Sequence, residues 1–305
     1  MVVGNSLRRF ESVLVVVGLF LANLIVRPAE SAEPAAKPAE NAAKSKYLRI
    51  VRDAQDRTIG LETAIISFGP AAPQAADVQV DLVAAVHIAD KAYYEELNKR
   101  FARYDAVLYE LVAPEGTRIP KGGRKDKRAG NMLTGFQLGM KDMLKLEFQL
   151  DQVDYTRTNF VHADLSPDQF AKSMKDRKEG FSDIFTRLLA YALAKQAQGG
   201  DGGEMQMFMA LFDNNRALAL KRAMADQFQE MEGMMAVFEG PKGSTLIGER
   251  NKRALDVLKQ QISAGKKKIA IFYGAGHMAN MEKRLCADFS LKPNQTQWLQ
   301  AWNMK

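Results

Sequence analysis

The chain is poor in the side chains that build most recognisable chemical sites. It has a single cysteine, Cys286, so it can form no internal disulfide and no thiolate metal cluster. With three histidines in 305 residues, any metal ion must be held by histidine and carboxylate. No GxSxG elbow and no Walker loop occurs, and Gly274-x-Gly276 lacks the third glycine of a dinucleotide-binding loop. These absences argue against an elbow-type serine hydrolase, a P-loop enzyme and a Rossmann enzyme.

Long apolar runs are also missing, except near the N-terminus. Arg8 and Arg9 precede the uncharged segment 12–26, which is shorter than the roughly 20 residues of a typical membrane span. The segment fits the apolar region of a signal peptide, with cleavage expected after Ser31. An uncleaved signal anchor is the alternative and would associate the protein with the membrane. Both alternatives predict an exported protein of the periplasm, the cell envelope or the extracellular space.

The remaining chain divides into a linker and one domain. Residues 32–46 are mainly alanine, proline, glutamate and lysine, a composition typical of an unfolded linker. Residues 47–305 are long enough for one large core with a helical insertion, which we place at about 131–240.

A net charge of +7 raises the question of anionic partners. Much of the excess lies in the segments 121–128 and 266–268, and neither is interleaved with the aromatic residues of a single-strand binding groove. We interpret both segments as solvated loops and expect no nucleic-acid partner.

Apolar patterning predicts an α/β fold with a central mixed, largely parallel sheet and flanking helices. Residues 78–88 alternate and then become continuously apolar, as in a strand covered on both faces. A helix capped by Asp90 and a second buried strand, 106–111, complete a β-α-β unit. The segment 268–273 is a further buried strand.

Other strands and helices are expected on either side of this unit. Two opening strands are predicted at 47–52 and 61–68, and a last strand near 296–302 would place Trp298, Gln300 and Trp302 on one face. Helices are predicted at 131–150, 182–198, 204–235 and 244–264, with a further helix starting at Ser166 in a capping box with Gln169. The methionines of 204–235 favour adaptable core packing over a peptide-binding or lipid-facing surface.

Three polar residues stand at the ends of the buried strands. His87 ends one strand, Glu110 stands near the end of the next, and His277 follows the segment 268–273. If these strands are parallel neighbours, the three side chains meet at the edge where open α/β sheets bind ligands. A carboxylate in an apolar run needs a partner, and Arg250 is the candidate. Gly274 and Gly276 would allow backbone or substrate to approach His277 closely.

A structural role for these histidines is the alternative interpretation. A single histidine at a strand end is more often structural, but two at equivalent strand ends favour function. The third, His162, is a site candidate on a loop, for which a structural role is favoured.

The motifs resemble those of the TraB/PrgY/GumN/Tiki family. That family has two GxxH motifs with an acidic residue and an arginine between them. The segments 86–90 and 107–111 resemble its opening, and the segments 248–251 and 274–277 resemble its close. The second GxxH motif matches in full, whereas Ala84 stands where the first has glycine. The resemblance spans about residues 47 to 290.

The resemblance implies an α/β fold distantly similar to erythromycin-esterase-like proteins and a metal-dependent hydrolase. His87 and His277 would bind a divalent metal ion (Mn, Co or Zn), with Glu110 as a ligand or general base. Arg250 would stabilise the oxyanion, and Asn251 is a further site candidate beside it.

Two functions remain open at this point. The first is a metal-dependent hydrolase of the cell envelope, a peptidase acting on a peptide or protein substrate. The second is a non-catalytic envelope protein that binds or sequesters a peptide or another ligand in the same cleft. The family resemblance, rather than residue spacing, favours the first.

Overall fold

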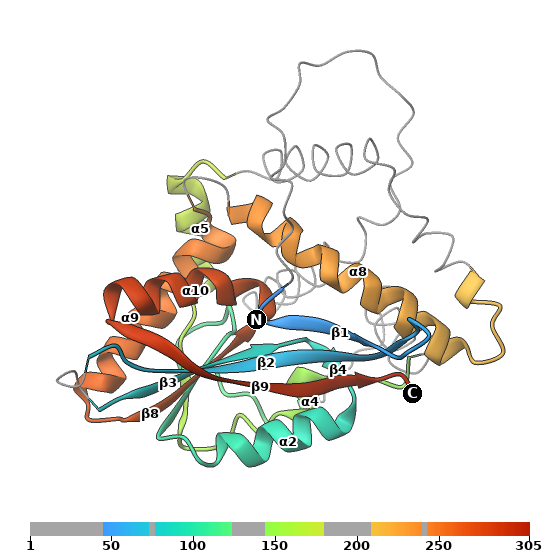
Figure 1. Ribbon diagram of the computed structural model, residues 1–305. Coiled ribbons are helices and arrows are strands. Elements are labelled where there is room, and N and C mark those ends of the chain that lie inside the picture. The colour runs from blue at the N-terminus through green and yellow to red at the C-terminus, as the bar shows by residue number, and fades with distance from the viewer. Residues whose placement is uncertain (1–44, 73–76, 124–143, 180–208, 240–242) are drawn as a thin grey trace.

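The structure is a computed structural model that describes residues 45–72, 77–123, 144–179, 209–239 and 243–305 (Figure 1). The predicted signal segment, most of the linker and the predicted helix 182–198 lie outside these ranges. Within them, no helix is long and apolar enough to cross a membrane.

One mixed sheet forms the centre of the molecule. Its strands follow the order β1-β2-β3-β8-β5-β7, and β9 also pairs with β2. The strands β3, β8, β5 and β7 run parallel, whereas β1, β2 and β9 pair antiparallel. The bounds are β1 (Leu48–Arg52), β2 (Thr58–Pro70), β3 (Gln79–Ala85), β5 (Ala106–Tyr109), β7 (Phe160–His162), β8 (Lys268–Gly274) and β9 (Leu291–Asn303). The expected α/β fold with a mixed sheet is confirmed.

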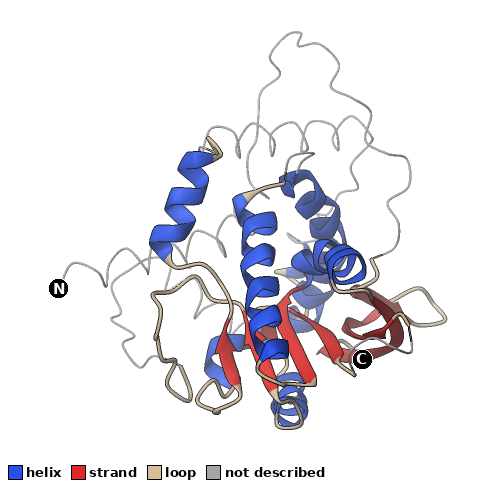
Figure 2. Cartoon of the chain, turned by 90° about the vertical axis from the view of Figure 1, so that its left-hand side faces the viewer, coloured by secondary structure: helices blue, strands red, loops and turns tan. Residues whose placement is uncertain are grey.

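Helices cover both faces of this sheet, which explains why its central strands are largely apolar. Val83 and Phe272 pack on the face covered by α2 (Lys91–Phe101). Leu82 and Ile271 pack on the opposite face, under α9 (Arg250–Ser263) and α10 (Ala275–Asp288). Figure 2 shows the sheet between these helices. Tyr94, Leu97 and Phe101 of α2 pack against the sheet and are buried.

The remaining described elements lie around the carboxyl ends of the parallel strands and beside β1. They are β4 (Ile88–Ala89), β6 (Glu147–Phe148), α4 (Gln149–Gln152), α5 (Pro167–Asp176), α8 (Arg216–Glu239) and a π-helical turn (Thr245–Glu249) that leads into α9. The capping box of α5 is confirmed, because Ser166 and Gln169 bond each other's backbone N–H groups.

Three helix predictions need correction. Residues 147–148, at the end of the predicted helix 131–150, form β6, which pairs with β4. The predicted helix 204–235 is interrupted, and α8 begins only at Arg216, because the Asp213 carboxylate accepts the Asn215 N–H in a turn. The span expected as a helical insertion also contributes β7, which pairs with β5 at the edge of the main sheet.

Asp90 stands at the N-cap position of α2 without capping the helix. Its carboxylate instead accepts hydrogen bonds from Lys221 of α8 at 2.7 Å and from the backbone N–H of Asn303 at 2.6 Å. The residue therefore joins three distant segments rather than a single helix end.

The prediction that Trp298 and Trp302 share one face is wrong. The register between β9 and β2 shifts between Leu61 and Glu62, which leaves Ala301 as an extra residue in β9. Such a bulge moves the following side chains to the other face. Trp302 consequently packs on the α2 face and Trp298 on the α9 face.

Candidate functional site

The candidate site lies at the carboxyl ends of the parallel strands. His87 follows β3, Glu110 follows β5, and Gly274 is the last residue of β8. The register pairs Ala85 with Gly274 in the neighbouring strand, so these strand ends lie at the same level. This is the edge at which open α/β sheets bind ligands.

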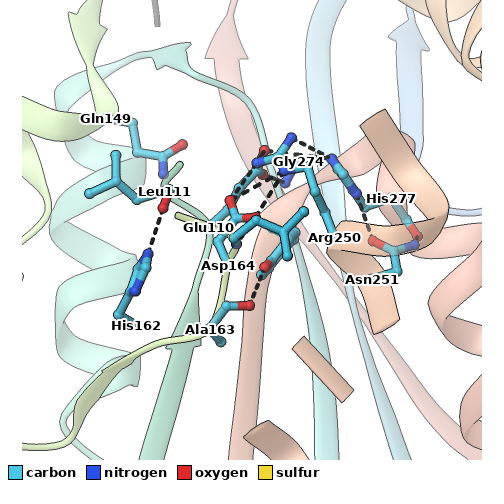
Figure 3. Close-up of polar contacts among 12 residues, drawn as sticks. Glu110, Leu111, Gln149, His162, Ala163, Asp164, Arg250, Asn251, Gly274 and His277 are labelled. Atoms are coloured by element: carbon cyan, nitrogen blue, oxygen red, sulfur yellow. Dashed lines mark hydrogen bonds and ion pairs between the residues drawn. The ribbon is translucent and has the colours of Figure 1, made fainter. Parts of the chain in front are cut away.

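Arg250, at the start of α9, holds two carboxylates at this edge (Figure 3). Its Nε and Nη2 atoms donate to Oδ1 and Oδ2 of Asp164 at 3.0 and 2.6 Å. Nη2 also donates to Oε1 of Glu110 at 2.6 Å. Arg250 is 3% exposed and Asp164 is 2% exposed. Two carboxylates share one guanidinium, so the trio has one more negative than positive charge.

Glu110 is held ionised by its neighbours. Burial alone would raise the pKa of its carboxyl group, but Arg250, then His277 and His87, hold that pKa well below its usual range. Its second oxygen, Oε2, accepts the backbone N–H of Gly274 at 2.7 Å. Both carboxylate oxygens therefore have a partner in the folded chain.

His277 lies in the first turn of α10 and presents one nitrogen to the site. Its Nδ1 lies 2.7 Å from Oδ1 of Asn251, while the Asn251 amide nitrogen donates to the His277 carbonyl and to Asn280. The Asn251 oxygen is thus the acceptor, and Nδ1 carries the proton. In the neutral ring this leaves the lone pair on Nε2, which accepts from Arg250 Nη1 at 3.4 Å and lies 3.5 Å from Glu110 Oε1.

His87 approaches the same point from the solvent side. Its side chain is exposed. A Cβ atom placed on Gly274 would lie 3.4 Å from Glu110 Oε2 and 3.9 Å from both His87 Nε2 and His277 Cδ2. The absence of a side chain at Gly274 therefore keeps the space between the three residues open.

The structure brings together six of the eight predicted site residues, namely His87, Glu110, Arg250, Asn251, Gly274 and His277. His162 is not among them, because its Nε2 lies 2.6 Å from the Leu111 carbonyl and its ring packs against Tyr109. These contacts fit the structural role favoured for His162. Gly276 lies within the first turn of α10.

Sequence reasoning missed Asp164 and Tyr273. Asp164 comes directly after β7, a strand of three residues that is too short for its apolar pattern to be recognised. Tyr273 lies within β8, where it looks like an ordinary core residue. Its hydroxyl donates to the Ala163 carbonyl at 2.6 Å, and its ring packs edge-on against His277. It thereby joins β8 to the segment that carries Asp164.

The donor atoms partly match a metal site. In the described residues, no group of three or more His, Cys, Asp or Glu side chains is assembled to hold a metal ion. The 3.5 Å between His277 Nε2 and Glu110 Oε1 nevertheless matches the roughly 3.4 Å between two ligands of one tetrahedral ion with bonds of about 2.0–2.2 Å. A metal held by these two atoms would displace Arg250 Nη2 from Glu110 and Nη1 from His277, and Arg250 would keep its bonds to Asp164 through Nε and Nη2.

Comparisons with protein-family models, curated proteins and solved structures found no match. The resemblance to the TraB/PrgY/GumN/Tiki family therefore depends on the motif residues alone and stays a prediction.

Proposed function

We propose that this cluster is the active site of an exported, metal-dependent hydrolase that cleaves peptide bonds in the cell envelope. The observation that supports it is that the ionised Glu110 carboxylate, His87 Nε2 and the ring edge of His277 surround Gly274, a residue without a side chain. His87, His277 and Glu110 would hold the divalent ion. The excess negative charge of the Arg250, Asp164 and Glu110 trio favours a bound cation.

The residues of the cluster have distinct roles in this proposal. A divalent ion, when bound, would polarise the scissile carbonyl and lower the pKa of a bound water molecule. Asn251 holds the Nδ1–H of His277 and so leaves the Nε2 lone pair available beside Arg250 and Glu110. Asp164 keeps Arg250 in place, and the buried guanidinium stabilises negative charge that develops on the carbonyl oxygen.

Elemental analysis of the purified full-length chain tests this function. After reconstitution with manganese, cobalt or zinc, we expect near-stoichiometric metal in the wild type and loss of metal in His87→Ala and His277→Ala. His162→Ala is the matched control, because His162 bonds to Leu111 outside the cluster, and it should retain the metal. Hydrolysis of a peptide library should follow the same pattern.

Absence of metal from the reconstituted wild type would contradict the proposal, as would full turnover in His277→Ala. Absence of metal would favour the non-catalytic binding protein, whereas full turnover in His277→Ala would place catalysis outside this cluster. The binding-protein alternative predicts ligand binding that survives replacement of His87 and Glu110.

A further inference from the structure

Gln149, the first residue of α4, has a buried hydrogen-bond acceptor without a partner. The residue is 6% exposed, and its Nε2 donates to the Tyr155 hydroxyl at 2.9 Å. Among the described residues, its Oε1 has no hydrogen-bond partner. A buried unpaired acceptor destabilises a fold, and most buried polar groups therefore have a partner.

Two contacts link Gln149 and its partner Tyr155 to the candidate site. The backbone N–H of Gln149 donates to the His87 carbonyl at 2.9 Å, so α4 starts next to that histidine. The ring of Tyr155, which carries the partner hydroxyl, lies 5.1 Å from the ring of Tyr109, the residue before Glu110. In Figure 3 Gln149 is drawn to one side of the cluster of Glu110, Asp164 and Arg250, and no dashed line joins it to that cluster.

The effect of the Glu110 charge on Tyr155 agrees with a position of Gln149 and Tyr155 near the site. Burial, and in smaller part the charge of Glu110, raises the pKa of the Tyr155 hydroxyl. The pair of Gln149 and Tyr155 is therefore close enough to Glu110 to experience its charge, although it forms no hydrogen bond with the charged cluster.

We infer that Gln149 Oε1 contacts the substrate and accepts a hydrogen bond from the N–H group of the scissile amide bond. This inference rests on the proposed hydrolase function and adds a substrate preference to it. An amide substrate supplies the missing donor, whereas an ester of the same acyl group leaves the buried oxygen unpaired. Sites with such buried polar groups discriminate strongly against analogues that lack the matching group.

The test compares two matched substrate sets on the full-length, metal-reconstituted chain. One set contains N-acetyl-aminoacyl p-nitroanilides, which have an N–H in the scissile bond, and the other contains the corresponding p-nitrophenyl esters. Gln149→Met keeps the length of the side chain and removes both amide atoms. We expect it to lower kcat/KM for the anilides about tenfold, as for the loss of one hydrogen bond, and to leave the esters unchanged.

Gln152→Met, on the same short helix, is the matched control. Gln152 donates to Glu147, away from the cluster, so this variant should leave both substrate sets unchanged. Circular dichroism and the Tm of each variant report whether the fold is retained. Gln149→Asn, which keeps an amide on a shorter side chain, provides a second variant if Gln149→Met does not fold.

The outcomes separate the inference from the function on which it rests. Equal effects of the Gln149 variant on anilides and esters would overturn the inference, as would cleavage of esters alone, and both would leave the hydrolase function standing. Failure of the wild type to cleave either set in a His277-dependent manner would overturn both. A loss confined to the anilides supports both.

Discussion

At the scale of single residues, the site is built around one buried arginine. Arg250 bonds Asp164 through two nitrogens and Glu110 through one, and all three side chains are largely withdrawn from solvent. Buried charges of this kind are tolerated only while every partner is present. The arrangement therefore keeps Glu110 ionised and fixed beside His277, as a metal ligand requires.

The depressed pKa of Glu110 predicts a pH dependence of stability. Arg250, His277 and His87 face this carboxylate and lower its pKa in the folded chain against the opposing effect of burial. The stabilisation is complete above the usual pKa of about 4.5 and is lost as the pH falls below it, because the unfolded chain then binds a proton that folded Glu110 does not.

Denaturant titrations in a chelator between pH 3 and 7 would check this expectation. The free energy of unfolding of the wild type should fall below about pH 4.5, and that of Glu110→Gln should start lower and fall less steeply. Glu95→Gln, which changes an exposed carboxylate on α2, is the control and should follow the wild type. Identical slopes of unfolding free energy against pH for Glu110→Gln and the wild type would show that Glu110 titrates alike in the folded and unfolded chain.

At the scale of secondary structure, capping residues and terminal glycines locate helix ends well, and apolar patterns alone do not. The capping box at Ser166 and the positive φ of Gly265 after α9 mark helix ends by local chemistry. The apolar spacing of 131–150 indicated a helix, but residues 147–148 pair as β6 with β4 before α4 begins. Pairing with a distant segment overrides local preference there.

The cap at Ser166 also determines how the chain leaves Asp164. Its hydroxyl accepts the Gln169 N–H at 3.2 Å, and Gln169 Oε1 accepts the Ser166 N–H at 2.9 Å. Ser166→Ala removes one of these bonds and should lower the free energy of unfolding by about 1 kcal/mol.

Chemical denaturation of Ser166→Ala and Ser263→Ala would measure this effect. Ser263 is the exposed last residue of α9, and its replacement should change stability by less than about 0.5 kcal/mol. Equal losses in the two variants would mean that the cap contributes nothing specific.

At the scale of the whole molecule, the last strand holds the sheet and the site together. β9 pairs with β2 along most of its length, and Trp302 is completely buried. The indole nitrogen of Trp302 donates to the Ile88 carbonyl at 2.8 Å, one residue after His87. The C-terminal strand thus supports the segment that carries a proposed metal ligand.

Replacement of Trp302 should therefore be severe. Trp302→Ala removes a fully buried ring and should cost about 3–5 kcal/mol of unfolding free energy. Trp298→Ala is the matched control, because Trp298 is half-buried and its ring stacks with Arg49 at 4.1 Å. Denaturant titrations would compare the two variants. Equal losses of unfolding free energy would contradict this role of Trp302.

The sequence alone determined the β-α-β core and the meeting of His87, Glu110 and His277 at one edge of the sheet. These features follow from local periodicity and from the constant handedness of parallel connections. Only the tertiary structure decided that Asp164 shares Arg250, that Gln149 lies beside His87 and that Trp298 and Trp302 occupy opposite faces. Each of these depends on pairing between distant segments or on a bulge of one residue, and neither leaves a periodic signal in the chain.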